Sequence, residues 1–281
     1  MARDTVRGLL IEARRVLADA GIDSAGLDAR LLLQAAAALR HEDIVADPDG
    51  EIVAPVASTF RHMVARRVTH EPVSRILGER EFYGRGFRVS PAVLDPRPDT
   101  EALIVETLKH VKPGARILDL GTGTGAIIVT LLAECPTASG IATDLSAAAL
   151  EIARANSGRH GTGSQLGFVH CNWFDGITGC FDVIVSNPPY IALAEIAGLG
   201  PGVRDFDPWR ALDGGPDGLE AYRRIASGAG PHLAPAGLIV VEIGAGQEMP
   251  VAAIFAACGL TLKCSATDLS GHVRCLVLAR P

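Results

Sequence analysis

The tetrapeptide Asn187-Pro188-Pro189-Tyr190 contains residue types that could position a nitrogen atom for chemistry. The side-chain oxygen of Asn187 and the backbone carbonyl oxygen of Pro188 can each accept a hydrogen bond from an N–H group. Proline lacks a backbone N–H and restricts φ, so the segment should hold both acceptors in fixed directions. Tyr190 offers a flat apolar surface for the group that binds there. Alone, the tetrapeptide could equally be a proline-rich turn.

Methyl transfer to an NH₂ group is the reaction that this arrangement suits. An amide or aniline-like nitrogen is a poor nucleophile because its lone pair is delocalised. Holding such a nitrogen in line with a sulfonium methyl group would make the transfer effectively unimolecular. A strong general base is not required, because the nitrogen becomes acidic once it has attacked. We therefore predict Asn187, Pro188 and Tyr190 as catalytic residues, and all four members of the tetrapeptide as substrate-binding residues.

A glycine-rich loop and an acidic residue predict a nucleoside cofactor. The loop is Gly121-Thr122-Gly123-Thr124-Gly125, and it directly follows an apolar run. Glycine allows positive φ and a close approach of the backbone to a ligand. The spacing differs from the dinucleotide fingerprint and lacks the lysine of a P-loop, so the loop alone could be a tight strand–helix connection. Asp144 ends the next apolar run, about 20 residues further on, where a carboxylate can bind both hydroxyls of a ribose.

The elements that position these residues form an α/β pattern from about residue 99 onward. Short apolar runs bounded by turn residues occupy residues 116–120, 140–143, 167–170, 181–186, 237–243, 260–266 and 273–279. Amphipathic segments such as 147–156 and 219–232 lie between them. We predict a Rossmann-like, doubly wound, seven-stranded sheet with ligands at the carboxyl ends of its strands. The link 267–272 is too short for a parallel crossover, so the last strand pair should be antiparallel.

The residues before this sheet have a different pattern. Apolar residues recur at three- and four-residue spacing in three stretches of the first 75 residues, which predicts a small helical bundle. Residues 79–89 change period around Gly84-Arg85-Gly86, which indicates a β-hairpin closed by these residues. We therefore divide the chain into a helical domain (1–78), a β-hairpin connector (79–98) and a sheet domain (99–281).

Composition narrows the classes of function. The formal net charge is −6, and all of the acidic excess lies beyond residue 90. A nucleic-acid substrate usually requires a basic surface, so we expect no direct nucleic-acid binding. The six cysteines do not have metal-ligand spacing, and we expect neither a metal nor a disulfide framework. No apolar run could span a membrane and no secretion signal is evident, so we expect a cytoplasmic protein.

The sequence resembles the release factor glutamine methyltransferase family over nearly its full length. The matching stretches are residues 71–73, 76–84, 96–101, 117–126, 186–191, 211–219 and 242–244, together with Gln247. The tetrapeptide itself is shared with DNA adenine-N6 methyltransferases, whereas Pro96-Arg97-Pro98 and the helical leader are more specific. The family methylates the glutamine of a Gly-Gly-Gln loop in peptide chain release factors.

The resemblance implies roles for individual residues. S-adenosylmethionine would have its methionine part surrounded by the loop 121–125, its ribose on Asp144 and its adenine near Asn172 and Trp173. Asn187 would lie close to both cofactor and substrate, Arg97 on the substrate side, and the helical leader would help to recognise the release factor; we expect a monomer. Asn172 stands where the family usually has Asp, so its contact with the adenine amine would lack charge. Asp95 and Asp207 also depart from the family pattern.

Three other interpretations remain open at this point. A relative could methylate a glutamine of a ribosomal protein with the same tetrapeptide. An adenine-N6 methyltransferase would need a basic groove and a base-reading domain, whereas the helical leader here is neutral. A non-catalytic binding module would not need the glycine loop, Asp144 and the tetrapeptide together.

Overall fold

The computed structural model describes residues 4–268 and 270–281 and separates into two compact units. One unit comprises the described residues up to Gly78 together with Gly200–Phe206. The other comprises the described residues of Glu79–Leu199 and Asp207–Pro281. The division into domains 1–78, 79–98 and 99–281 therefore stays our proposal, with residues 79–98 belonging to the compact unit that holds the sheet.

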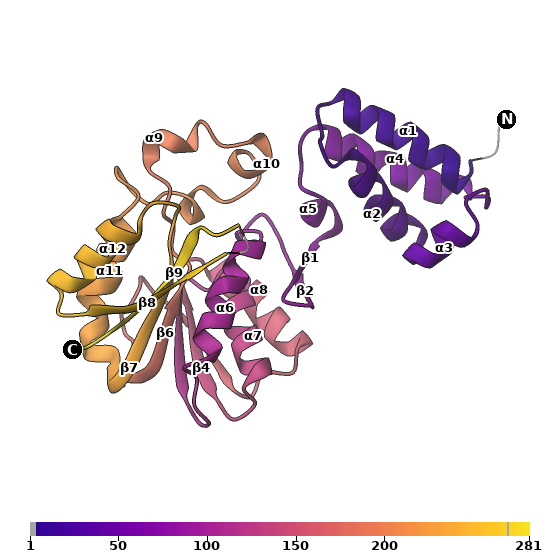
Figure 1. The fold of residues 1–281 in the computed structure, drawn as a ribbon. Helices are drawn as coiled ribbons and strands as arrows, with labels where there is room; N and C mark the ends of the chain where they lie inside the picture. Colours follow the sequence, from indigo (N-terminus) through magenta and orange to yellow (C-terminus); the bar gives the residue numbers. More distant parts are fainter. Residues whose placement is uncertain (1–3, 269) are drawn as a thin grey trace. The chain divides into compact units, whose positions relative to one another are not determined.

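The first unit is helical (Figure 1). Its helices are α1 (Val6–Asp19), α2 (Ala25–Ala37), α3 (His41–Ala46), α4 (Ala54–Val68), α5 (Val73–Leu77) and α10 (Pro201–Arg204). The predicted apolar stripes meet in a core that includes Leu9, Leu17, Leu32 and Phe60, all at most 1% exposed. Helices α3, α5 and α10 were not predicted, because segments of four to six residues are too short to display a helical period.

A β-hairpin opens the second unit, with strands β1 (Glu79–Phe82) and β2 (Arg85–Arg88). The predicted β-hairpin is confirmed and Gly84 lies in its turn, but the prediction that Arg85 and Gly86 also close it was wrong. Tyr83 and Gly84 form the turn, with φ of +50° and +68°, and Gly86 pairs with Glu81 inside the ladder. Two consecutive positive φ angles give the two-residue turn whose twist matches that of paired strands.

A seven-stranded sheet forms the centre of this unit, and the predicted doubly wound architecture is confirmed. The strands are β3 (Arg116–Leu120), β4 (Ser139–Asp144), β5 (Leu166–His170), β6 (Phe181–Ser186), β7 (Leu233–Glu242), β8 (Thr261–Thr267) and β9 (Val273–Ala279). Their order in the sheet is β5-β4-β3-β6-β7-β9-β8. Strand β9 is antiparallel to both of its neighbours, as the short link 267–272 predicted.

Helices cover both faces of the sheet (Figure 1). The elements outside the sheet are η1 (Pro98–Thr100), α6 (Glu101–Leu108), α7 (Ala126–Glu134), α8 (Ala147–Arg159), α9 (Leu193–Ile196), η2 (Trp209–Ala211), α11 (Glu220–Ala229), η3 (Gly230–His232) and α12 (Glu248–Ala257). Successive strand residues point to opposite faces, so Ile117 packs in the core under α6 and α7, and Leu118 in the core under α11 and α12. Both faces of the sheet are buried under helices, which accounts for the uninterrupted apolar runs in the sequence.

The strand order fixes where a ligand can bind. The chain runs outward from β3 through β4 to β5, and then returns to the other side of β3 with β6. The crevice of a doubly wound sheet lies at this reversal, outside the carboxyl ends of the strands. The glycine loop after β3 and Asn187 after β6 are thereby brought to adjacent strand ends, with Asp144 at the end of β4 on the other side of β3. Among the described helices, none combines the length and apolar character needed to cross a bilayer.

Candidate active site

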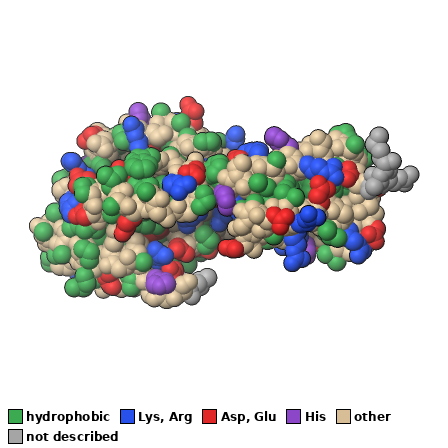
Figure 2. All heavy atoms as spheres, turned by 90° about the horizontal axis from the view of Figure 1, so that it is seen from above, with side chains coloured by type: hydrophobic (Ala, Val, Ile, Leu, Met, Phe, Trp, Pro, Cys, Tyr) green, Lys and Arg blue, Asp and Glu red, His purple; other side chains and the backbone are tan. Residues whose placement is uncertain are grey.

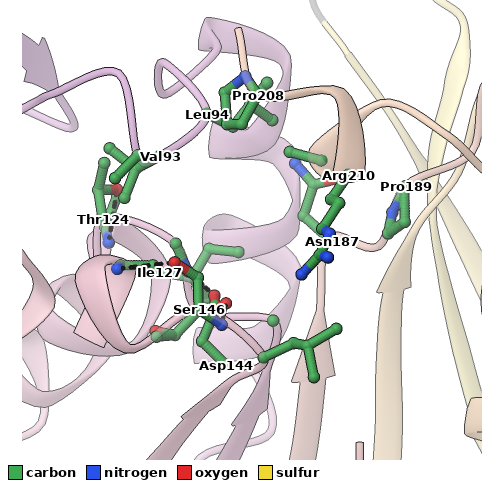
Figure 3. A pocket seen from close by; sticks show the side chains of 18 of the residues that line it. Val93, Leu94, Thr124, Ile127, Asp144, Ser146, Asn187, Pro189, Pro208 and Arg210 are labelled. Carbon is green, nitrogen blue, oxygen red and sulfur yellow. Dashed lines mark hydrogen bonds between the residues drawn. The ribbon is translucent and has the colours of Figure 1, made fainter. Parts of the chain in front are cut away.

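A cavity of about 470 Å³ lies at the carboxyl ends of β3, β4 and β6. This volume is in the range of pockets that hold small-molecule ligands and cofactors. The glycine loop, Asp144 and Asn187 all line it, as do the segments 92–97 and 208–211. Figure 3 shows Asp144 and Ser146 on one side of the cavity and Asn187 and Pro189 on another, with Val93 and Leu94 above. The structure thus brings together residues that lie more than forty positions apart in the sequence.

The glycines of the loop have two different roles. Gly121 and Gly123 line the cavity with φ of +70° and +55°, and a Cβ atom added to either would meet no atom within 4 Å. A side chain there would be strained and would extend into open space. Gly125 does not line the cavity, and its contact with the cofactor stays a prediction. A Cβ at Gly125 would lie 3.1 Å from the Cβ of Ala153, so this glycine permits close packing of α7 against α8.

Asp144 is fastened to the glycine loop by its own carboxylate. One oxygen, Oδ2, accepts a hydrogen bond from the backbone nitrogen of Gly123 at 2.9 Å, and Oδ1 accepts one from the backbone nitrogen of Ser146 at 2.8 Å. Each carboxylate oxygen keeps a second lone pair for a ligand. The carboxylate is therefore oriented before any ligand binds, and the side chain of Ser146 caps α8.

A second carboxylate supports the loop from below. Asp119 is fully buried at the end of β3, and it accepts a hydrogen bond from the hydroxyl of Thr122. Burial raises the pKa of Asp119 to about 7, and the nearby charge of Asp144 acts in the same direction. Asp119 was not predicted as a site residue; its charge within an otherwise apolar strand was the available signal.

The segment after β5 supplies Cys171, Asn172 and Trp173 to the cavity wall. Trp173 has φ of +53°, an unusual conformation for a large side chain, and its carbonyl oxygen accepts a hydrogen bond from the thiol of Cys171. Leu145 lines the same region and is 52% exposed, although it is apolar. Sequence reasoning missed Leu145, because a leucine directly after a strand reads as part of the core.

Asn187 is half-buried, and its amide is oriented by a neighbour. Its Nδ2 donates a hydrogen bond to the hydroxyl oxygen of Thr100 at 3.1 Å. The amide oxygen is thereby assigned to the other side of the group, as an acceptor. Thr100 is the last residue of η1, is buried and also lines the cavity, yet sequence reasoning did not identify it.

The rest of the tetrapeptide lies differently with respect to the cavity. Pro189 lines it, whereas Pro188 is buried and Tyr190 is half-buried without contributing to the lining. The ring of Tyr190 packs in the core under α11 and α12, and burial raises the pKa of its phenol to about 12. Direct substrate contacts by Pro188 and Tyr190 therefore stay predictions, and the observed surroundings of Tyr190 are those of a packed core residue.

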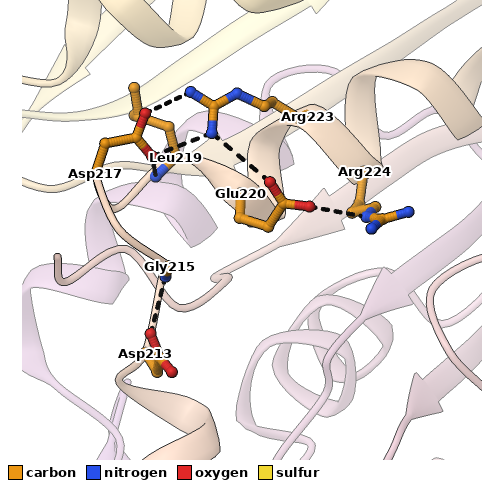
Figure 4. A network of polar contacts seen from close by, with 7 residues as sticks. All are labelled: Asp213, Gly215, Asp217, Leu219, Glu220, Arg223 and Arg224. Atoms are coloured by element: carbon orange, nitrogen blue, oxygen red, sulfur yellow. Dashed lines mark hydrogen bonds and ion pairs between the residues drawn. The ribbon is translucent and has the colours of Figure 1, made fainter. Parts of the chain in front are cut away.

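A second glycine-rich turn holds the tetrapeptide in place. Ile191 and Asp213 form a parallel bridge, and the nitrogen of Gly214 donates to the carbonyl of Ile191 at 2.9 Å. A Cβ at Gly214 would lie 2.9 Å from two backbone atoms of Tyr190, so no larger residue fits there without a shift. Figure 4 shows how Asp213 accepts from the nitrogen of Gly215 and how ion pairs of Asp217, Glu220, Arg223 and Arg224 order the turn that follows.

The connector forms the remaining wall. Arg97 lines the cavity, and its guanidinium pairs with the fully buried carboxylate of Asp207. The connector itself is tied to α8 by Asn156, whose amide bonds to both backbone groups of Arg88 and to the carbonyl of Thr124. Trp209 lies at the same wall and is 52% exposed. Asp207, which departs from the family pattern in the sequence, is thus the residue that holds Arg97.

Charged side chains of both signs are mixed over the face of each unit seen in Figure 2, without a continuous basic region on that face. Among the described residues, one group has potential metal-ligand atoms within 4.8 Å of one another, and it consists of Glu106, His110 and Cys264. None of the three lines the cavity, and the Glu106 carboxylate already accepts from Lys109 and contacts His110.

Comparisons with known proteins show which families and structures the chain is similar to. Residues 8–78 match the family model described as PrmC N-terminal domain, and residues 95–197 match that of the methyltransferase small domain. A release factor glutamine methyltransferase from Agrobacterium fabrum is 46% identical over 98% of both chains. One from Cereibacter sphaeroides is 48% identical over 94% of both chains. A methyltransferase structure from Pyrococcus furiosus is 19% identical, with a TM-score of 0.54 over 71% of this chain and 90% of that one, and it supports the fold alone.

Proposed function

The chain belongs to the release factor glutamine methyltransferase family, and we propose on this basis that it methylates the glutamine side-chain amide in the Gly-Gly-Gln loop of peptide chain release factors. The methyl donor in this proposal is S-adenosylmethionine. The relatives cover nearly the whole chain, so both the helical unit and the sheet unit take part in the likeness. The hydrogen bond from Nδ2 of Asn187 to Thr100, which turns the amide oxygen the other way, is the observation that supports the chemistry most directly.

The cavity residues fit this cofactor. The bare backbone at Gly121 and Gly123 faces open space, as a cradle for a ligand requires. Asp144 presents an oriented carboxylate to a ribose, and the exposed face of Leu145 with Trp173 gives an apolar surface for a base. We propose that Asn172 accepts from the adenine amine. When bound, the cofactor supplies a methyl group on a positively charged sulfur.

The chain's own residues would position the glutamine. With Nδ2 of Asn187 turned toward Thr100, the amide oxygen is the group left to accept one N–H of the substrate. The carbonyl oxygen of Pro188 would accept the other N–H. The two prolines supply no backbone N–H that could compete for this oxygen, and they hold the segment stiff. Two acceptors fix the plane of the substrate NH₂, so the nitrogen is aimed rather than deprotonated. Arg97, Pro189 and Tyr190 are proposed to contact the peptide around it.

The alternatives can be separated by one assay. The protein is incubated with S-adenosylmethionine labelled in the methyl group and with a release factor, purified ribosomal proteins or duplex DNA. We expect label only in the release factor. Label in a ribosomal protein would support the relative with a different protein target. Label in DNA would overturn the proposal of a protein substrate. The acidic sheet unit and its mixed surface charge argue against DNA as the substrate.

Three further expectations belong to this proposal. The helical unit would contribute to recognition of the release factor, since its family model is separate from that of the methyltransferase domain. The enzyme would work in the cytoplasm, where release factors act. It would act as a monomer, which sedimentation at working concentration would test.

A further inference from the structure

Glu242 lies beside Asn187 at the carboxyl ends of the neighbouring strands β7 and β6. Strands β6 and β7 are parallel, and Ser186, the last residue of β6, pairs with Val241. The residues that follow this pair are Asn187 and Glu242. The Glu242 side chain is 1% exposed and its Oε2 accepts no hydrogen bond from any described residue. A buried carboxyl group with an oxygen left without a donor costs free energy, so a purely structural role does not explain it.

Thr100 connects the two side chains. Its hydroxyl oxygen accepts from Nδ2 of Asn187, which leaves its proton to be donated elsewhere. The carboxyl group of Glu242 interacts with the side chains of both Thr100 and Asn187. The amide N–H of Asn187 thus donates to the hydroxyl of Thr100, whose proton is left for the neighbouring carboxyl group of Glu242. Tyr222 fixes the backbone of Glu242, because its phenol donates to the backbone carbonyl of Glu242 at 3.0 Å.

We propose that Glu242 is a positioning residue that acts with Thr100 to hold the Asn187 amide with its oxygen toward the substrate. An asparagine amide is nearly symmetric in shape, so only its partners decide which end faces outward. A hydroxyl polarised by a carboxylate is an acceptor toward Asn187, and it selects the NH₂ end. If the amide rotated by half a turn, its NH₂ would face the NH₂ of the substrate, and two donors would oppose each other.

This inference rests on the proposed function, because the substrate NH₂ comes from there, but the orientation of Asn187 is a property of the free enzyme. Glu242→Gln removes the charge while nearly preserving shape, and Thr100→Val removes the hydroxyl. Thr100→Ser restores the hydroxyl as a conservative control. Glu106→Gln and Thr130→Val serve as matched controls, since Glu106 and Thr130 are buried residues outside the cavity and Thr130 Oγ1 has no hydrogen-bond partner among the described residues.

The first measurement is steady-state kinetics on a release factor. We expect kcat to fall about tenfold in Thr100→Val, which loses a neutral hydrogen bond. We expect it to fall about tenfold or more in Glu242→Gln, which loses a charge-assisted interaction. The KM for S-adenosylmethionine should change by less than about threefold. Thr100→Ser and both matched controls should stay within about threefold of the wild type. The double variant Thr100→Val/Glu242→Gln should lose less than the product of the single losses, because both act through the Asn187 amide.

The second measurement does not depend on the substrate. The side-chain NH₂ resonances of Asn187, assigned by their disappearance in Asn187→Ala, should exchange slowly with solvent in the wild type and faster in Thr100→Val and Glu242→Gln. The melting temperature of Glu242→Gln at about pH 8 should equal or exceed that of the wild type, because a costly buried charge is removed. A loss of kcat together with such stability separates positioning from structural damage.

The outcomes decide between the two claims. Wild-type enzyme that leaves the release factor unmethylated would overturn the proposed function, whereas unchanged NH₂ exchange in both variants would overturn the positioning role. Normal kcat in Glu242→Gln and Thr100→Val would also overturn it. Equal losses in the matched controls would show that any buried change slows the enzyme, which contradicts the inference as well.

Discussion

The carboxylate of Asp144 accepts a hydrogen bond from the backbone nitrogen of Gly123 at 2.9 Å, so the end of β4 is fixed to the loop that follows β3. The other oxygen of the same carboxylate faces the nitrogen of Ser146. Two backbone donors thus converge on one side chain, and only a group with two acceptor atoms satisfies both. The wall of the cavity is preorganised by this contact, and an amide cannot replace it.

Asp144→Asn should weaken S-adenosylmethionine binding by about tenfold or more, because the amide NH₂ would face one of the two backbone donors and the charge is lost. Isothermal titration calorimetry measures the dissociation constant directly. Asp182→Asn is a suitable control, since Asp182 accepts a backbone hydrogen bond from Arg116 outside the cavity. Equal affinity in wild type and Asp144→Asn would refute the assigned role.

The catalytic rate should rise as the pH rises through about 7. Burial raises the pKa of Glu242 to about 7, while Thr100 and Arg274 oppose the shift, and only the ionised carboxylate polarises Thr100 as an acceptor. The other ionisable groups that interact with Glu242 are Asp99, Tyr190, Tyr222 and Cys275. Asp119 has a pKa raised to about 7 as well, so the informative quantity is the difference between wild type and Glu242→Gln. A kcat profile with the same inflection in both proteins would exclude Glu242 as its source.

The same shift has a defined sign for stability. The folded pKa of Glu242 is raised above its ordinary value of 4.5, so its stabilising contribution is fully present below that value and is lost as the pH rises through about 7. Relative to wild type, Glu242→Gln should therefore gain free energy of unfolding across this window, by about 3 kcal/mol at most. Urea denaturation at several pH values measures the gain, and a variant that loses stability as the pH rises would contradict it.

Gly214→Ala should lower kcat by roughly tenfold to a hundredfold, since the added Cβ meets backbone atoms of Tyr190 and must displace the tetrapeptide. The dissociation constant for S-adenosylmethionine should change little, because Gly214 does not line the cavity. Gly158→Ala is the matched control, as a Cβ at this glycine of α8 meets nothing within 4 Å. Normal turnover in Gly214→Ala would show that the turn does not position the tetrapeptide.

Arg97→Lys should raise the KM for the release factor by about tenfold and leave cofactor binding unchanged. The planar guanidinium pairs with the buried Asp207 carboxylate and still lines the cavity, and lysine cannot reproduce this fork. Arg85→Lys, which changes an ion pair with Glu134 away from the cavity, controls for the general loss of an arginine. A higher dissociation constant for the cofactor instead would place Arg97 on the cofactor side.

The sequence was most informative where one local rule sufficed. Buried parallel strands read as apolar runs, so the sheet and the strand ends bearing Asp144 and Asn187 were predictable. The turn at Tyr83-Gly84 was not, because Gly86 looks like a turn residue and only the ladder register shows otherwise. The packing of Gly125 against α8 was not predictable for a similar reason, since a glycine that faces a ligand and one that faces a helix are identical in sequence.

The residues that orient the site could not be found from local patterns. Thr100 and Glu242 are separated from Asn187 by 87 and 55 positions, and only the packing of η1 and β7 against β6 brings them together. The resemblance to the family includes the stretch that begins at Glu242, but it does not indicate what Glu242 does. Tertiary contacts between polar side chains far apart in the chain thus carry the information that the sequence lacks.

The mass spectrum of a release factor after incubation with the enzyme and S-adenosylmethionine tests the central claim most directly. Fragmentation should place one added methyl group on the side-chain nitrogen of the Gly-Gly-Gln glutamine. With Asn187→Ala the methylated peptide should fall at least about a hundredfold while cofactor affinity stays within about tenfold. A methyl group on any other atom, or undiminished methylation by Asn187→Ala, would contradict the account.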